Sequence, residues 1–298
     1  MNLWIQLILG FLAAAPALLV LLVVMACGLL ARRKSRVPVK DKLLRAPGET
    51  LQRRLTRFDD AAMFYILGLL IFSFVCFALF VAFANWRQKS PHLLPEMICF
   101  WLVILVITLP ISWKAAKIMQ RYRNDFLGLR GERAVGEELN KLMLDGCLVY
   151  HDVPGEGEWN VDHVVVAPTG VYAIETKTRS KDRCAKDRKD YEVVYDGKTL
   201  QYPNWTDTHG LDQAKANAKW LAKHLSNALA EEIRVIPILA LPGWLVTSRV
   251  RPSGNELRVL SHKQIREAIL DGRTQTIDEK LIGQIGYQLE LKCRDVEF

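Results

Sequence analysis

Residues 161–177 read VDHVVVAPTGVYAIETK, and they are the most informative stretch for the architecture. Residues 161–167 and 171–176 are apolar runs of strand length, and the Pro-Thr-Gly between them is a typical turn sequence. Each run is apolar at neighbouring positions, which is typical of a central strand whose two faces are both covered by helices. The stretch therefore predicts a hairpin of two buried strands.

Two acids and a lysine interrupt these apolar strands, namely Asp162, Glu175 and Lys177. An ionised carboxylate in such a place is costly unless it is paired, metal-bound or protonated. A two-residue turn pairs Ala167 with Gly170, and the same register sets Asp162 opposite Glu175, whereas a slip of one residue separates them. Two carboxylates beside an ammonium suit Mg²⁺, which binds one or two carboxylates with water and phosphate oxygens. Taken alone, Glu-x-Lys is more often a solvated strand face or a cross-strand ion pair.

Further elements on both sides of the hairpin extend the pattern. A helix over 131–144 with a stop at Gly146 and a strand over 147–153 precede the hairpin, and a helix over 211–229 and a strand over 235–241 follow it. The order α-β-β-β-α-β predicts an α/β (α+β) domain with a mixed sheet flanked by helices. Other expected elements are a small hairpin over 191–202, a strand over 257–260 and helices near 262–270 and 277–291.

Several of these residues follow the order found in a known family. Gly131-Glu132 in the first helix, Asp162-His163 in a strand, residues 170–177 and Gln213 at the start of a helix together resemble the nuclease-related domain, NERD. That family belongs to the PD-(D/E)XK restriction-endonuclease-like superfamily. The resemblance covers roughly residues 128–241. It implies an αβββαβ core, phosphodiester hydrolysis that depends on Mg²⁺ (or Mn²⁺), and a DNA or RNA substrate.

The resemblance also implies roles for individual residues. Asp162, Glu175 and Glu132 match the metal-binding acids, Lys177 matches the catalytic lysine, and Gln213 matches a glutamine that positions phosphate or water. Glu132 is alternatively a first-turn carboxylate favoured by the helix dipole, and Gln213 an exposed polar residue beside the apolar stripe. The histidine after Asp162 is more typical of a packed, hydrogen-bonded strand residue than of a base.

Charge is unevenly distributed along the chain. The net charge of +8 divides into +11 for residues 1–124 and −3 for residues 125–298, so the basic excess gives no general support for nucleic-acid binding. A local basic segment follows Lys177, and it either contacts phosphates, contacts lipid headgroups or is a solvated loop. Its candidate nucleic-acid-binding residues are Arg179, Lys181, Arg183, Lys186, Arg188 and Lys189.

Three long apolar stretches predict a membrane region in residues 1–124. Spans are expected at about 3–30, 61–86 and 97–113, and none of these stretches contains Asp, Glu, Lys or Arg. The 32–60 loop carries ten Lys/Arg, so the positive-inside rule places this loop and everything after residue 114 in the cytoplasm and the N-terminus outside. The prediction is a multi-pass protein of the cell (inner) membrane.

These inferences define three regions and two functional hypotheses. The regions are the membrane region at 1–124, the nuclease-like domain at 125–241 and a strand and helix extension at 242–298. The first hypothesis is a membrane-anchored, metal-dependent nuclease facing the cytoplasm. The second is a NERD fold without catalytic activity that serves as a membrane-tethered binding or scaffolding module. A transporter is disfavoured because the spans carry no ionisable Asp, Glu, Lys or Arg.

Overall fold

The computed structural model describes residues 42–58, a few residues between 68 and 79, and residues 93–296 except 158, 182–190, 252, 255 and 272–276. The chain divides into two compact units. The second unit comprises residues 41–55 and 122–297, and it contains all strands of the described residues. It carries every candidate site residue that the structure describes.

The predicted membrane spans find no support in the structure. In the described part of the chain, no helix is long and apolar enough to cross a membrane. The predicted span at 3–30 lies outside the described residues, and the one at 61–86 lies largely outside them. The third, at 97–113, lies within the long helix α3 (Leu93–Asn140).

The second unit is built on a five-stranded mixed sheet with strand order β10-β8-β4-β3-β2. Within this sheet, β2, β3 and β4 form an antiparallel meander, whereas β8 runs parallel to β4 and β10 runs parallel to β8. The strands are β2 (Leu148–Pro154), β3 (Asn160–Ala167), β4 (Gly170–Thr176), β8 (Val235–Ala240) and β10 (Arg258–Leu260). The predicted hairpin and mixed sheet are therefore confirmed.

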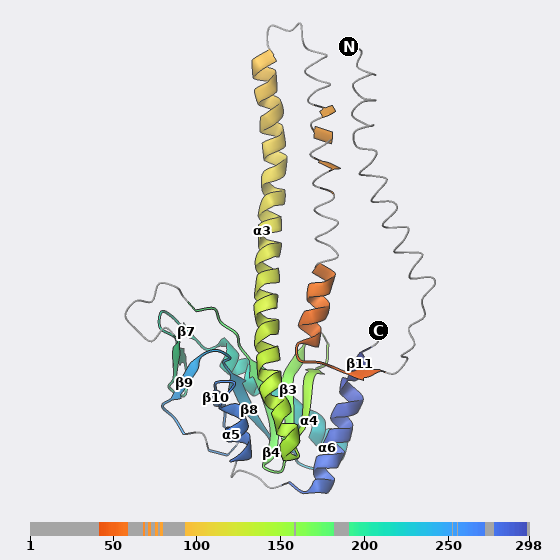
Figure 1. Cartoon of the computed structure of the whole chain (residues 1–298), viewed down its shortest axis with the longest axis vertical. Coiled ribbons are helices and arrows are strands. Elements are labelled where there is room, and N and C mark those ends of the chain that lie inside the picture. Colours follow the sequence, from red (N-terminus) through yellow and green to blue (C-terminus); the bar gives the residue numbers. More distant parts are fainter. Residues whose placement is uncertain are drawn as a thin grey trace. The chain divides into compact units, whose positions relative to one another are not determined.

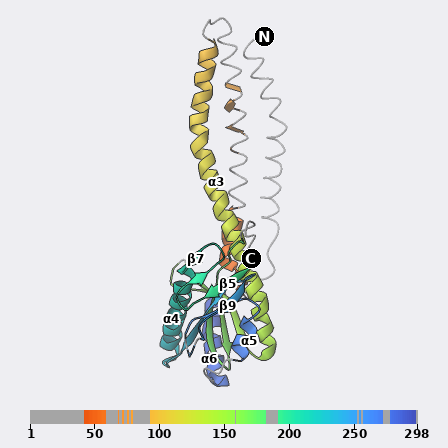
Figure 2. The same ribbon diagram turned by 90° about the vertical axis from the view of Figure 1, so that its left-hand side faces the viewer.

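Helices cover both faces of this sheet, which explains why β3 and β4 are apolar throughout. On one face, the C-terminal part of α3 and the helix α5 (Ile265–Leu270) pack against Val165 and Tyr172. On the other, α4 (His209–Leu229) and α6 (Glu279–Cys293) pack against Val164 and Ala173. Figures 1 and 2 show these helices flanking the sheet. Alternate side chains of each strand therefore enter different cores.

A smaller four-stranded sheet lies beyond the end of β4 in the sequence. Its strand order is β7-β6-β5-β9, and the predicted hairpin with Asp196-Gly197 at its turn joins β5 to β6. Of the two remaining pairings, β6 with β7 is antiparallel and β5 with β9 is parallel. The strands are β5 (Glu192–Tyr195), β6 (Leu200–Gln201), β7 (Thr206–Asp207) and β9 (Leu245–Ser248).

A segment from the N-terminal third completes the second unit. The strand β1 (Leu43–Leu44) pairs with β11 (Arg294–Val296), and a short helix covers residues 49–58. Residues 41–55, referred to below as the strap, belong to the same compact unit as residues 122–297. A domain that starts at residue 125, as expected from the sequence, leaves out the strap, although the strap belongs to the same compact unit.

The first helix of the domain is longer than expected. The apolar stripe predicted a helix over 131–144, whereas α3 begins at Leu93 and ends at Asn140. A 3-10 turn at Lys141–Asp145 follows, and Gly146 ends it in the left-handed conformation with φ 79°. A glycine at such a stop is favoured because it has no Cβ to clash.

Candidate functional site

Two side chains of helix α4, Gln213 and Asn217, hold two side chains at the polar end of β4, Glu175 and Lys177. Lys177 Nζ donates hydrogen bonds to Glu175 Oε1 at 3.0 Å and to Gln213 Oε1 at 2.7 Å. Asn217 Nδ2 donates to the other carboxylate oxygen, Glu175 Oε2, at 2.8 Å. Gln213 and Asn217 are four residues apart and so lie on one face of α4. The helix thereby fixes both the carboxylate and the ammonium.

Asp162 is fixed from the neighbouring strand. The turn pairs Ala167 with Gly170, as predicted, and the ladder continues to His163 opposite Ile174. One further step in the same register brings Asp162 to Glu175. There the Thr176 N–H donates to Asp162 Oδ2 at 2.7 Å, and the carboxylate is buried. The predicted register is therefore confirmed from His163 to Gly170, and the Thr176 hydrogen bond places Asp162 beside the end of β4.

Glu132 approaches from α3 and remains incompletely satisfied. Its side chain is 7% exposed, and Glu132 Oε2 has no hydrogen-bond partner. Burial, and then the negative charges of Asp152 and Glu175, raise the pKa of Glu132 to about 8. The first-turn explanation for this acid is wrong, because α3 begins far earlier at Leu93 and the dipole effect is confined to the first turn.

The pKa values of the other two acids of the site, Asp162 and Glu175, are also raised. Burial raises the pKa of Asp162, and the charges of Glu175 and Glu132 raise it further. Burial likewise raises the pKa of Glu175, opposed by the Lys177 ammonium and by hydrogen bonds from Lys177 and Asn217. Three acids thus share one nearby ammonium, and additional positive charge at this point would favour their ionised forms.

In the part of the chain that the structure describes, Asp162 and Glu175 have free acceptor positions that could bind a small divalent cation, but a third ligand beside them is not established. Asp162 commits Oδ2 to Thr176, and among the described residues its Oδ1 accepts no hydrogen bond. Each oxygen of Glu175 has one donor and a carboxylate oxygen has two acceptor positions, so Glu175 can accept a further ligand. Mg²⁺ needs only one or two carboxylates beside water. However, no three His, Cys, Asp or Glu side chains in the described ranges are arranged to hold a metal ion, so the role of Glu132 as a ligand stays a prediction.

This arrangement of acids, lysine and glutamine agrees with a family comparison. Residues 127–242 match NERD, the nuclease-related domain. The NERD region, as these residues are called below, contains all five residues for which the resemblance implied catalytic or metal-binding roles. They are Glu132, Asp162, Glu175, Lys177 and Gln213.

Two individual proteins are similar to parts of the chain. An uncharacterized protein of Bacillus anthracis is 30% identical over 86 residues, which cover 28% of this chain and 39% of that protein. The chain thus spans about two fifths of that relative's length. The Pyrococcus furiosus SfsA structure in complex with Ca²⁺ is 16% identical, with 60% of this chain and 55% of that chain covered, at a TM-score of 0.19. A likeness at this score does not establish a shared fold.

Asp152 is a fourth buried acid, on the strand next to Asp162, and the sequence interpretation missed it. In β2, His151 pairs with His163 and Val153 pairs with Val161, so Asp152 lies at the level of Asp162 on the next strand. It has a left-handed backbone with φ 51°. Asp152 is an acid within a largely apolar strand, as Asp162 is, so the same pattern could have identified it as a candidate site residue.

The strap supplies the counter-charge for Asp152. Arg45 Nη1 and Thr50 Oγ1 each donate to Asp152 Oδ2 at 2.7 Å, and Asn160 Nδ2 donates to Asp152 Oδ1 at 2.8 Å. The same Arg45 guanidinium binds both carboxylate oxygens of Asp295, at 2.7 and 2.6 Å. Asp152 itself is fully buried. Arg45 therefore ties the strap to both β2 and β11.

His163 in the NERD region is a packed strand histidine, in agreement with the simpler expectation. Its Nδ1 lies 2.8 Å from Nδ1 of His151, whose Nε2 lies 2.9 Å from Asn140 Oδ1. Burial lowers the pKa of His151 to about 4 and also lowers the pKa of His163. Both rings are therefore neutral at physiological pH, and the pair joins β2, β3 and α3.

The basic segment after Lys177 is described only at its beginning. Arg179 Nη2 forms an ion pair with Asp207 Oδ2 at 2.6 Å, so its charge is balanced within the protein. The Lys181 ammonium lies over the rings of Tyr191 and Trp244, at 5.8 and 5.5 Å from their centroids. The other predicted contacts lie outside the described residues; they are Arg183, Lys186, Arg188 and Lys189.

Proposed function

We propose that the NERD region is a divalent-metal-dependent nuclease that hydrolyses phosphodiester bonds in DNA or RNA. The observation that carries the proposal is the convergence of Asp162, Glu175 and Lys177 at the same end of β3 and β4. The family match supports a nuclease-like function for this region. The hydrolytic reaction and its dependence on Mg²⁺ or Mn²⁺ are part of the proposal.

In this proposal, Asp162 and Glu175 hold the cation. A bound Mg²⁺ supplies charge stabilisation to a phosphate and lowers the pKa of a coordinated water. Lys177 places a positive charge beside the reacting phosphate, where it stabilises developing negative charge. Gln213 and Asn217 are positioning residues, because Gln213 aims the Lys177 ammonium and Asn217 fixes the Glu175 carboxylate.

Cation binding gives a test that is independent of cleavage. Adding Mg²⁺ or Mn²⁺ to the purified full chain is expected to raise its melting temperature, because a ligand that binds only the folded state stabilises it. Asp162→Asn should remove most of this increase, whereas Asp207→Asn, at a half-buried ion pair with Arg179 outside the site, should retain it. Equal increases in the wild type and Asp162→Asn would contradict cation binding at this acid.

The alternative function is a binding or scaffolding module without catalysis, and one observation favours it. Glu175, Lys177, Gln213 and Asn217 already satisfy one another within the protein. Such a closed network can stabilise the end of β4 without any cation. A protein with no cation-dependent stabilisation and no cleavage would agree with this function.

We further propose that the N-terminal region anchors the NERD region to the cytoplasmic face of the cell membrane. The apolar stretches at about 3–30, 61–86 and 97–113 and the basic 32–60 loop support this proposal. The expected result is that the full chain stays in the membrane pellet after alkaline carbonate extraction. Complete release into the supernatant would contradict the anchor.

A further inference from the structure

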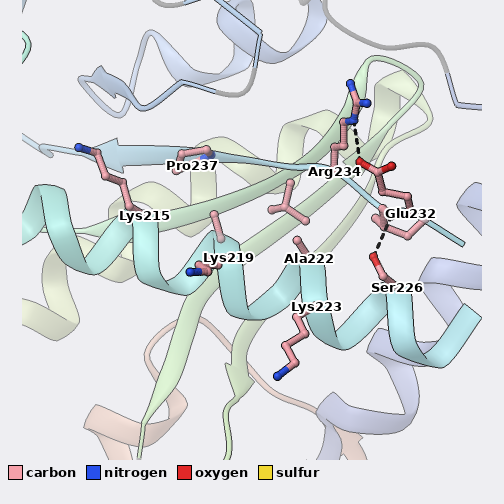
Figure 3. Close-up of a pocket in the computed structure, with 11 residues that line it drawn as sticks. Lys215, Lys219, Ala222, Lys223, Ser226, Glu232, Arg234 and Pro237 are labelled. Atoms are coloured by element: carbon pink, nitrogen blue, oxygen red, sulfur yellow. Dashed lines mark hydrogen bonds and ion pairs between the residues drawn. The ribbon is translucent and has the colours of Figure 1, made fainter. Parts of the chain in front are cut away.

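A basic groove lies between α4 and β8, away from the polar end of β4. It has a volume of about 460 Å³. Three of its lining residues, Lys215, Lys219 and Lys223, follow one another at intervals of four along α4. Consecutive members of such a row are separated by about 6 Å along the helix axis. Figure 3 shows the three lysines on α4 and Arg234 on the segment that leads into β8.

The lysine row is not balanced by acids. Asp212 is the only acid of α4, and no carboxylate of the described residues forms an ion pair with any of the three lysines. Glu232, which also lines the groove, pairs with Arg234 at 3.3 Å. Like charges four residues apart disfavour a helix, so an ordinary solvated face would carry interspersed acids. The row therefore concentrates positive charge within a domain whose net charge is −3.

A second groove adjoins the first near Lys215, the first lysine of the row. This second groove of about 400 Å³ shares Lys215 and Pro237 with the first and extends toward Tyr195 and Val250, and it is also lined by one acid, Glu256. Gln213, which binds the Lys177 ammonium, precedes Lys215 by two residues, and residues two apart project from opposite sides of a helix, so the row and the candidate site lie on different sides of α4. A row of three lysines that have no carboxylate partner among the described residues, along an elongated surface, fits an extended polyanion better than a single small anion.

We propose that the phosphate backbone of a nucleic-acid strand binds in this groove, along Lys215, Lys219 and Lys223. The choice of nucleic acid as the polyanion rests on the proposed nuclease function. Lysine ammonium groups bind phosphates mainly as point charges, so the contact is independent of base sequence. The groove would hold the strand on one side of α4, and a neighbouring segment of the strand would pass around the N-terminal end of α4 to reach the acids of β3 and β4.

Binding measured without turnover tests this proposal. The probe is a fluorescently labelled 20-nucleotide single strand of DNA or RNA, and the readout is its anisotropy with the purified full chain in EDTA. The triple variant Lys215→Ala/Lys219→Ala/Lys223→Ala is expected to raise Kd at least about tenfold in 0.1 M salt. It should also reduce the slope of log K against log salt by about 2–3, because each phosphate contact contributes roughly 0.7–0.9.

A matched control removes the same charge elsewhere. The triple variant Lys141→Ala/Lys263→Ala/Lys280→Ala changes three exposed lysines outside the groove, and it should bind as the wild type does. Unchanged binding by the groove variant, or an equal loss in the control, would overturn the proposal. So would a groove variant that loses binding only to phosphatidylserine vesicles. Loss of strand binding in the groove variant, with no cleavage by the wild type, would support the groove and remove the nuclease function.

Discussion

Replacing Arg45 with methionine is expected to lower the free energy of unfolding by about 3–5 kcal/mol, the usual cost of removing one partner from a buried ion pair. The Asp152 carboxylate is fully buried and would keep only Thr50 and Asn160 as donors. Asp295 would lose both of its Arg45 hydrogen bonds at the same time. Urea unfolding of the purified full chain, followed by tryptophan fluorescence, measures the change.

A second strap variant provides the control for this prediction. Arg53→Met removes the same kind of side chain from a partly exposed i,i+4 pair with Glu49 and a longer contact of 3.9 Å with Asp295, and surface pairs contribute about 0–1 kcal/mol. Arg45→Lys retains the charge without the forked geometry and should fall between the two. An Arg45→Met protein within about 1 kcal/mol of the wild type would show that the strap is not an integral part of the domain. The prediction also implies that a fragment beginning at residue 125 lacks a stabilising element.

Lys177→Met is expected to reduce nucleic-acid cleavage by at least about 100-fold, the usual cost of losing one preorganised group that stabilises transition-state charge. The substitution removes the ammonium that binds Glu175 and Gln213. Single-turnover cleavage of labelled DNA and RNA by the purified full chain measures the effect. Lys263→Met changes an exposed lysine outside the site and the groove and should keep most of the activity.

Stability must be measured for the same Lys177 variant. The substitution leaves Glu175 buried without its ammonium, so some loss of stability is expected. Lys177→Arg preserves the charge but changes the donor geometry, and it should restore stability more than activity. Full cleavage by a folded Lys177→Met protein would contradict a catalytic role for this lysine.

The sequence was sufficient for the parts of the site that depend on local pattern. A two-residue turn fixes the pairing of Ala167 with Gly170, and a fixed register determines which residues lie opposite each other. Asp162 and Glu175 could therefore be placed together before the structure was known. Gln213 was identified by its position at the start of a helix and by family resemblance.

Other contacts could not be derived from local pattern. Arg45 and Asp152 are 107 residues apart, and a long-range charge partner depends on how distant elements pack. The 32–60 loop was interpreted through its net charge, which does not distinguish a loop at a membrane surface from a segment packed on a domain. Asn217 was missed although it lies four residues after Gln213 between apolar positions, which is a local signal for a buried polar contact.

The most direct test of the central claim is cleavage of labelled single- and double-stranded DNA and RNA by the purified full chain. The reactions contain Mg²⁺ or Mn²⁺, and parallel reactions contain excess EDTA or the Asp162→Asn variant prepared in the same way. The proposed site predicts cation-dependent cleavage by the wild type that is lost in both parallel reactions. Cleavage of none of the substrates, or equal cleavage by the wild type and Asp162→Asn, would contradict a metal-dependent nuclease at this site.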